Sequence, residues 1–316
     1  MSAEDLKPRE ARHDDYESVV SFTRDTWSER GIDDYIPRVY HDWIDDDGDK
    51  HTLVMADGDE IGAIAQCVLL SEHEAWGQGL RVNPKYRGEG VSERITHALF
   101  DWAYENGARV MRNMVFSWNV AGLGQSRKVG YEPITEFRWA KPEPDPNADP
   151  ELDVVEDPAS AWSYWVKTDA RDHLKGLTLD MDESWAMSEL TLNDLKRASD
   201  ETKVLAVQKR GGTSGMAYRA REFEREAENE GDNGDSQVRE TERWVEYGVG
   251  VWDGADSARS LLGAISKDAA DMGADKARVL IPESVRYVSD TALARVNFSE
   301  EPDFVLGADL TDDYRS

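Results

Sequence analysis

Hydrophobic and polar positions in the first 140 residues change period repeatedly, which predicts strands that alternate with helices. Short apolar runs bounded by turn residues predict strands at 9–12, 52–56, 61–70, 75–82, 110–116 and 131–139. Apolar residues at a helical period predict helices from 14 or 15 to 27, at 35–44, from the glycines after 82 to 106–107, and at 120–129. The segment 57–60 is typical of a hairpin turn. This order of elements predicts an α/β unit.

The second half of the chain repeats this order of elements. Three pairs of corresponding positions are 167 to 169 residues apart: Trp76 and Trp244, Val110 and Val279, Tyr131 and Phe298. A nearly constant offset across three separate elements predicts a duplicated unit. Chance similarity between two α/β halves stays an alternative.

Proline and acidic residues separate the two halves. Five of the 11 prolines fall within residues 141–158, a composition typical of a linker, and Asp157-Pro158 is a helix start signal. We therefore expect a first unit at 1–141, a proline- and acid-rich linker with a helical segment at 142–184, and a second unit at 185–316. The charged run between 222 and 242 is expected to be a solvated loop.

The net charge of −28 limits the possible partners. One interpretation is an acidic patch that attracts cationic partners. The other, which we favour, is acid spread over the whole surface, as in halophilic proteins from a salt-rich cytoplasm. Either distribution argues against a nucleic-acid binder, because phosphate backbones require a basic face.

Cysteine use and hydropathy add further limits. Cys67 is the only cysteine, which excludes intrachain disulfides and cysteine-rich metal sites, and no metal is expected. No apolar run approaches the roughly 18 residues of a membrane span, and the first residues do not resemble a signal peptide. We expect a soluble cytoplasmic protein without a membrane partner. The sequence does not indicate an oligomeric state.

The segment 82–95 carries the clearest chemical signal, because it joins a strand to an amphipathic helix through Gly88 and Gly90. Unpaired N–H groups and the helix dipole favour an anion at such a helix start. Glycines let the backbone approach phosphate oxygens, and Arg87 adds charge-assisted hydrogen bonds. The alternative is a tight turn that needs the glycines only for their backbone angles. The segment matches neither a P-loop nor the dinucleotide-binding fingerprint.

These residues resemble the hallmark of the GNAT (Gcn5-related N-acetyltransferase) superfamily, Arg/Gln-x-x-Gly-x-Gly/Ala after a strand that ends in Val-x-Pro. The matching positions are Val82, Pro84, Arg87, Gly90 and Ser92. The later family signature, an Asn at a helix start followed by Gly-Phe/Tyr, is matched by Asn119 and Gly130-Tyr131. The resemblance covers about residues 8–140. It implies a mixed α+β sheet, and with the repeat it implies two tandem GNAT-like domains.

The resemblance also implies an activity, the transfer of an acetyl group from acetyl-CoA to a primary amine by direct attack in a ternary complex. Backbone groups of Leu80, Arg81 and Val82 would pair with the pantetheine arm, and one backbone N–H there would stabilise the oxyanion. Asn119 would bond the arm. The N–H groups that would hold the pyrophosphate belong to Arg87, Gly88, Glu89, Gly90, Val91 and Ser92.

The chain departs from the family pattern at two positions. Ser92 replaces the usual Gly or Ala, and Ser126 stands where the family commonly has a tyrosine as general acid. Ser126 is therefore a candidate that donates a proton or only positions the substrate. Strand alternation places Glu74 on one face with Trp76 and Gln78, so Glu74 is the candidate general base.

The second unit departs further, because Asp253 and Asp256 occupy its equivalent loop. Carboxylates would repel a pyrophosphate, so this half is expected not to bind coenzyme A. The chain is interpreted as an N-acetyltransferase acting on an amine-bearing small molecule or peptide. The alternative is a non-catalytic acyl-CoA-binding or protein-interaction module of the same fold. The acceptor is not readable from the sequence.

Overall fold

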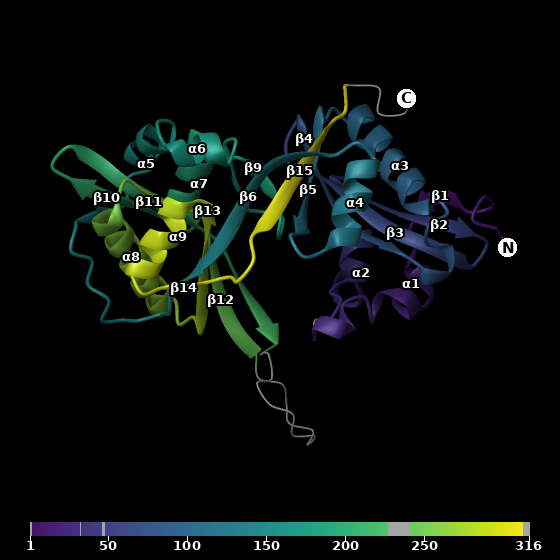
Figure 1. Cartoon of the computed structure of the whole chain (residues 1–316), viewed down its shortest axis with the longest axis horizontal. Coiled ribbons are helices and arrows are strands. Elements are labelled where there is room, and N and C mark those ends of the chain that lie inside the picture. The colour runs from purple at the N-terminus through teal and green to yellow at the C-terminus, as the bar shows by residue number, and fades with distance from the viewer. Residues whose placement is uncertain (1, 32, 46–47, 227–240, 312–316) are drawn as a thin grey trace, which may run out of the picture. The chain divides into compact units, whose positions relative to one another are not determined.

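The computed structural model describes residues 2–31, 33–45, 48–226 and 241–311. The chain forms two compact units. The N-terminal unit comprises Met1–Ile134 and Val305–Ser316, and the C-terminal unit comprises Thr135–Phe304. Each unit contains helices packed on strands of a β-sheet (Figure 1). The mixture of parallel and antiparallel neighbours confirms the predicted mixed α/β fold.

The N-terminal unit follows the predicted order closely. Its strands are β1 (Lys7–Glu10), β2 (Lys50–Asp57), β3 (Glu60–Leu69), β4 (Glu74–Val82), β5 (Val110–Phe116), the start of β6 (Glu132–Lys141) and most of β15 (Asp303–Asp309). Its helices are α1 (Tyr16–Thr23), α2 (Ile36–Ile44), α3 (Val91–Glu105) and α4 (Val120–Lys128). One predicted end is wrong, because α1 stops at Thr23 and Trp27 lies beyond it.

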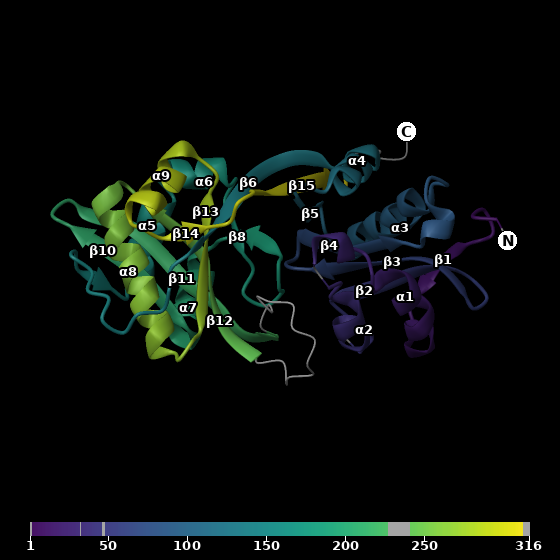
Figure 2. The same ribbon diagram turned by 60° about the horizontal axis from the view of Figure 1, so that its bottom comes forward.

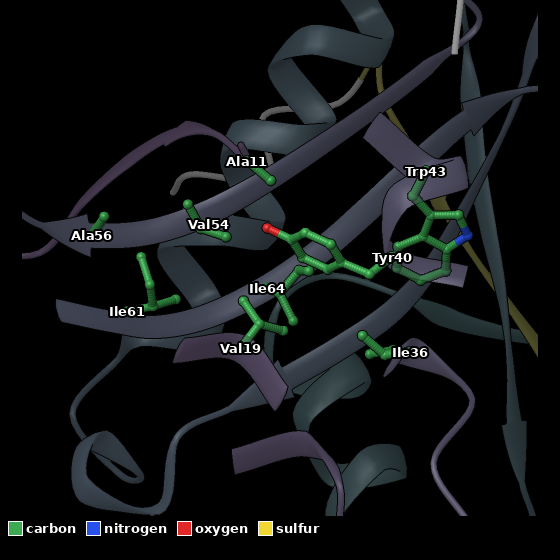
Figure 3. Close-up of a cluster of buried hydrophobic side chains, with 9 residues drawn as sticks. All are labelled: Ala11, Val19, Ile36, Tyr40, Trp43, Val54, Ala56, Ile61 and Ile64. Carbon is green, nitrogen blue, oxygen red and sulfur yellow. The ribbon is translucent and has the colours of Figure 1, made fainter. Parts of the chain in front are cut away.

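Helices cover both faces of this sheet. Figure 2 shows α3 and α4 on one face and α1 and α2 on the other. The core beneath α1 and α2 gathers aliphatic side chains from β2 and β3 around Tyr40 and Trp43 (Figure 3). The Tyr40 hydroxyl donates to the Arg12 carbonyl at 2.7 Å, which satisfies the one polar atom of this buried ring.

The two central strands part midway along their length. The parallel pairing of β4 and β5 covers only Glu74–Val110, Ala75–Met111 and Trp76–Arg112. Further along β4, Ile64 pairs with Arg81 while Gln66 pairs with Gln78. Two residues of β4, Gly79 and Leu80, therefore oppose one residue of β3, which is a β-bulge. Gly79 has φ +66°, and a Cβ there would run into the Trp43 ring, so this position requires glycine.

The C-terminal unit has an equivalent order of elements. Its own strands are β7 (Val154–Val155), β8 (Leu177–Leu179), β9 (Met187–Glu189), β10 (Lys203–Lys209), β11 (Gly212–Glu226), β12 (Thr241–Trp252), β13 (Lys276–Pro282) and β14 (Asn297–Phe298). Its helices are α5 (Pro158–Trp165), α6 (Asp169–His173), α7 (Leu192–Glu201), α8 (Ala255–Asp271) and α9 (Val285–Leu293). Asp157 caps α5, as the sequence predicts.

The strand orders of the two units correspond. The N-terminal order is β1-β2-β3-β4-β5-β15-β6, and the C-terminal order is β7-β10-β11-β12-β13-β6, with β14 beside β6. The last part of β6 thus occupies in the C-terminal unit the place that β15 occupies in the N-terminal unit. Each unit is completed by a strand from the other part of the chain.

Because β6 and β15 each complete the sheet of the other half of the chain, the compact units end at residues that differ from the expected boundaries. The segment expected as a linker, 142–184, contributes β7, α5 and α6 to the C-terminal unit. Residues from Val305 onwards, expected in the second unit, belong to the N-terminal one. Most of the charged run between 222 and 242 lies outside the described residues.

Candidate functional site

The parting of β4 and β5 leaves central strands partly exposed. In β4 the three residues that pair with β5, Glu74 to Trp76, are buried, whereas Leu80, Arg81 and Val82 are half-buried. In β5, Asn113 and Met114 are likewise half-buried after two buried residues. Residues in the middle of a sheet covered on both faces are normally fully buried. Unpaired backbone groups of β4 are therefore accessible at the place where the sequence predicts the pantetheine arm.

The glycine loop presents backbone N–H groups at the start of α3. Gly88 and Gly90 have φ +80° and +75°, with nothing within 4 Å of a Cβ at either position. They are required for their backbone angles and leave open space beside them. Arg87, Gly88 and Glu89 are exposed, and no side chain caps α3. The first N–H groups of this helix, which include those of Val91 and Ser92, have no capping side chain among the described residues.

The side chains of Lys85 and Tyr86, directly before the loop, anchor it through Glu60. Tyr86 is buried, and its hydroxyl donates to Glu60 at 2.8 Å, while the Lys85 ammonium contacts the same carboxylate at 2.6 Å. Both bonds lower the pKa of Glu60. The anchoring leaves Arg87 at the surface, where its Nε donates a long hydrogen bond of 3.4 Å to the Val82 carbonyl. The arrangement favours an anion at this loop.

Asn119 lies at the start of α4, where the sequence predicts a contact to the arm. Its Oδ1 accepts a hydrogen bond from the Gly122 N–H at 2.9 Å, so its first role is to cap the helix. The cap orients the side chain, which is half-buried. Asn119 follows directly on the segment that ends β5.

Ser126 is buried on α4 and faces β5. Its hydroxyl accepts from Asn113 Nδ2 at 3.1 Å. Asn113 Oδ1 is buried and meets no donor among the described residues. Asn113 is the first residue of β5 after its pairing with β4 ends. The unsatisfied amide oxygen is a reason to expect a polar ligand or water beside this pair.

Glu74, the candidate general base, is paired with Arg112 at the start of β4. Glu74 is buried at the first residue of β4, where β4 and β5 still pair. Its Oε1 accepts from Arg112 at 2.5 Å, and Oε2 accepts from the Ser71 hydroxyl at 3.1 Å. Six residues along a strand separate Glu74 from Leu80, roughly 20 Å at about 3.3 Å per residue. The carboxylate is committed to an ion pair far from the bulge.

Tyr131, which the sequence gives only as part of the Gly-Phe/Tyr signature, reaches the point where β4 and β5 separate. Its hydroxyl lies 2.8 Å from the position of a Cβ on Gly77, the first residue of β4 after the pairing. The side chain is buried, and burial raises its pKa well above the usual value. The hydroxyl therefore stays protonated at neutral pH. No spacing rule distinguishes it from an ordinary core tyrosine in the sequence.

A cluster that the sequence did not reveal borders the same strands. We call Trp27, Arg30, Arg81, Phe116 and Trp118 the arginine–aromatic cluster. The Arg81 guanidinium lies 4.3 Å from the Trp27 ring centre, and that of Arg30 lies 4.0 Å from the Trp118 ring centre. Trp27 contacts the rings of Phe116 and Trp118 edge-on at 5.8 and 6.1 Å.

An ion pair fixes one arginine of this cluster. Arg81 Nε donates to the buried carboxylate of Asp34 at 2.6 Å. The side chain of Arg81 is thereby turned towards the segment between α1 and α2, while its backbone remains in the exposed part of β4. The sequence missed the cluster because Trp27 fits a helical period and its contacts Arg81, Phe116 and Trp118 lie 54 to 91 residues further along the chain.

The equivalent place in the C-terminal unit is closed. A bulge recurs in β12, because Ala217 pairs with Gly250 while Arg219 pairs with Tyr247. Beyond it Trp252 is fully buried, and its carbonyl accepts from Arg286 at 2.7 Å. The Asp253 carboxylate in the following loop accepts from Ser257 and contacts Lys209.

The described residues offer neither a metal site of this kind nor a membrane-spanning helix. Within 2–31, 33–45, 48–226 and 241–311, no group of three His, Cys, Asp or Glu side chains is placed to hold a metal ion. In the same part of the chain no helix is long and apolar enough to cross a membrane. Cys67 is buried, and burial raises the pKa of its thiol.

Comparison with known proteins identifies relatives of the N-terminal unit. Residues 16–131 match the model of the acetyltransferase (GNAT) family. Histidine N-acetyltransferase of Xenopus tropicalis is 33% identical over 131 residues, 40% of this chain and 36% of that protein. The uncharacterized N-acetyltransferase YobR of Bacillus subtilis is 28% identical over 88 residues, 28% of this chain and 30% of that protein. The chain thus matches about a third of the length of these relatives.

Solved structures match almost the whole chain. A GCN5-related N-acetyltransferase from Sphaerobacter thermophilus superposes with a TM-score of 0.59 over 98% of this chain and 97% of its own, at 12% identity. At this identity the likeness shows the fold alone. The likeness extends over both units.

Proposed function

We propose that the N-terminal unit, whose residues 16–131 match the model of the acetyltransferase (GNAT) family, binds acetyl-CoA and transfers its acetyl group to a primary amine. The observation that carries the proposal is the parting of β4 and β5 beside a helix start with exposed backbone amides. A thioester held between the strands would have its phosphates at the loop.

The residues of the N-terminal unit fit this co-substrate. The N–H groups from Arg87 to Ser92 hold the pyrophosphate, with the Arg87 guanidinium beside it. The half-buried backbone from Leu80 to Val82 pairs with the amides of the arm, as an additional strand would. Asn119 bonds the arm from the start of α4. Their arrangement in space supports this assignment because it leaves these groups accessible on one side of the sheet.

The chemistry is a direct transfer. The amine nitrogen attacks the thioester carbonyl carbon, a C–N bond forms and the C–S bond breaks. The amine loses one proton and the departing thiolate gains one. A backbone N–H of Leu80 to Val82 stabilises the oxyanion, an effect of about 3 kcal/mol in other enzymes, and holding both reactants together supplies much of the remainder.

Two hydroxyls are candidates to protonate the thiolate. Ser126 occupies the position that the family pattern assigns to the acid, but a serine hydroxyl is a weak acid and this one is held by Asn113. Tyr131 is buried and protonated, and it points to Gly77 beside the parting strands. We propose Tyr131 as the donor and Ser126 as a positioning residue. With Glu74 committed to Arg112, a water molecule takes the proton of the amine.

The test of the proposal combines binding and turnover. Wild-type protein is titrated with coenzyme A by calorimetry, and thiol release from acetyl-CoA is followed with a panel of amines at high salt. Arg87→Glu is expected to weaken coenzyme A binding at least tenfold by repelling the pyrophosphate. Arg210→Glu, at an exposed turn of the C-terminal unit, is the matched charge control. Equal affinities of the two variants would refute the role of the loop.

The second candidate is a non-catalytic acyl-CoA-binding or protein-interaction module. The pairing of Glu74 with Arg112 favours it, because it removes the expected carboxylate base. Coenzyme A binding without turnover on any amine would establish this alternative. For the C-terminal unit we propose that it does not bind coenzyme A, since buried Trp252 and the carboxylate of Asp253 occupy the equivalent place.

We propose in addition that the acidic composition adapts the chain to a salt-rich cytoplasm. The 65 acidic residues outnumber the 37 Lys and Arg, and self-repulsion at low ionic strength destabilises such a compact state. Molar salt shortens the Debye length to about 3 Å and relieves the repulsion. The unfolding temperature is expected to rise with potassium chloride, and a constant value would exclude this interpretation.

A further inference from the structure

The arginine–aromatic cluster lies where an acceptor would approach the parting strands, and we infer that it selects an amine that carries a carboxylate and a planar side group. Arg30 would bind the carboxylate, and Trp27 and Trp118 would border the planar group. The inference rests on the proposed acetyl transfer and specifies its acceptor. The position, the charge and the shape of the cluster support it.

The position of Trp27 places the cluster across the gap. Arg81, which stacks on Trp27, comes from β4, and Phe116, which Trp27 contacts edge-on, comes from the end of β5. Trp27 therefore touches both strands beyond the point where they stop pairing. Trp27 belongs to the segment between α1 and α2, and these helices cover one face, whereas the glycine loop leads into α3 on the other face (Figure 2). The two faces offer separate approaches for the acyl donor and the amine.

The two arginines of the cluster, Arg30 and Arg81, differ in whether their charge is already paired with a described carboxylate. Arg81 is neutralised by the buried carboxylate of Asp34. Arg30 is exposed, stacks face-on upon Trp118, and makes no ion pair with a described residue. A stacked guanidinium keeps its N–H groups free at the edge, where they match a carboxylate in two parallel hydrogen bonds. In a chain with a net charge of −28, an unpaired guanidinium at this place is a specific feature.

The rings determine the shape of the group that fits beside Arg30. Trp27, Phe116 and Trp118 are all half-buried and leave ring surface exposed. Phe116 and Trp118 stack at 5.1 Å with an interplanar angle of 8°, and Trp27 stands nearly perpendicular to both. Such walls favour a flat aromatic or heteroaromatic group over a long flexible chain, because rings stack face-to-face or edge-on. An aromatic α-amino acid has the required amine, carboxylate and plane.

The experiment compares acceptors that differ only in the carboxylate: L-histidine with histamine, and L-phenylalanine with phenethylamine. Wild-type protein is expected to prefer the amino acid in each pair by about 10- to 100-fold in kcat/KM, the contribution of a charge-assisted hydrogen bond. Arg30→Gln is expected to abolish this preference by raising KM for the amino acids, with the rates for the decarboxylated amines unchanged. Arg30→Lys is expected to restore part of it.

Controls separate this inference from the proposed function. Arg38→Gln, an exposed arginine of α2 outside the cluster, should leave the preference intact. Coenzyme A affinity, measured by calorimetry, should be equal in all variants. Turnover without a preference for the carboxylate, an equal loss on both members of a pair, or turnover only of amines outside these pairs would overturn the inference while the proposed function stands. Absence of coenzyme A binding in the wild type would overturn both.

Discussion

The hydroxyl oxygen of Tyr131 lies 2.8 Å from the point where a Cβ on Gly77 would stand. Tyr131 lies between α4 and β6, and Gly77 lies in β4. The contact therefore joins the turn after α4 to β4 at the point where β4 stops pairing with β5. The glycine is required here because of space, since its φ is not positive. The contact brings a buried protonated hydroxyl to the proposed thioester site.

A methyl group at residue 77 should be poorly tolerated. It would also meet Met111 Cε at 2.6 Å, so Gly77→Ala is expected to destabilise the N-terminal unit by about 2 kcal/mol through overpacking. Removing the hydroxyl with Tyr131→Phe should relieve part of this strain. The double variant, measured by urea unfolding, is then more stable than the sum of the two single effects. If the effects of Gly77→Ala and Tyr131→Phe on stability simply added, the contact with the Tyr131 hydroxyl would not be the reason that residue 77 must be glycine.

Tyr131→Phe also tests the proposed proton donor. The substitution removes one oxygen and keeps the ring, so the kcat for acetyl transfer is expected to fall by about 100-fold while coenzyme A affinity is retained. Ser126→Ala should have a smaller effect on kcat. An unchanged kcat in Tyr131→Phe would return Tyr131 to a packing role and leave solvent as the donor.

The Glu74–Arg112 pair predicts an effect on stability. Both side chains are about nine-tenths buried, with exposed fractions of 12% and 9%. Glu74→Gln would remove the carboxylate charge beside the buried Arg112 guanidinium and should lower the free energy of unfolding by roughly 3 kcal/mol. Glu72→Gln, at an exposed position nearby, is the control. If Glu74→Gln instead abolished turnover with unchanged stability, Glu74 would be the base after all.

Asp303 predicts a pH dependence in the C-terminal unit. Burial raises its pKa to about 6, although the Trp139 indole N–H donates to the carboxylate at 3.2 Å. The folded state therefore binds this proton more tightly than the unfolded chain, and the stability contributed by Asp303 falls as the pH rises from about 4 to about 6. Asp303→Asn does not titrate. The free energy of unfolding of the Asp303→Asn variant, relative to that of the wild type, should increase by about 1.5 kcal/mol between about pH 5 and about pH 8.

The measurement for Asp303 is urea unfolding of both proteins at the two pH values. Glu143→Gln, an exposed carboxylate in the same unit, should show no such change. A difference between Asp303→Asn and wild type that is independent of pH would mean that Asp303 is ionised in the folded protein at both values.

The exchanged strand predicts a long-range effect. Leu306 is buried in β15, which lies beside β5 in the N-terminal unit. Leu306→Ala should lower stability by about 3 kcal/mol and increase amide hydrogen exchange in β5, almost 200 residues earlier in the chain. Val285→Ala, at an exposed site on α9, is the matched control. Faster exchange confined to the C-terminal unit would contradict the assignment of β15.

Sequence patterns predict well where the cause is local. The β2–β3 hairpin, the extent of β5 and the cap of α5 were all predicted, because turn residues and period act within a few residues. The loop from Arg87 to Ser92 belongs to this group, since glycines with positive φ before a helix require little from the rest of the chain.

The sequence by itself thus determined the order of elements and the helix start that could hold an anion. Tertiary structure decided the rest: the partner of Glu74, the approach of Tyr131 to Gly77, the gathering of Trp27, Arg30 and Trp118, and the exchange of β6 and β15. The physical reason is that these contacts join residues far apart in the chain. The strand that completes a sheet and the charges that pair within it depend on the relative free energies of alternative tertiary structures. A local sequence pattern does not contain this information.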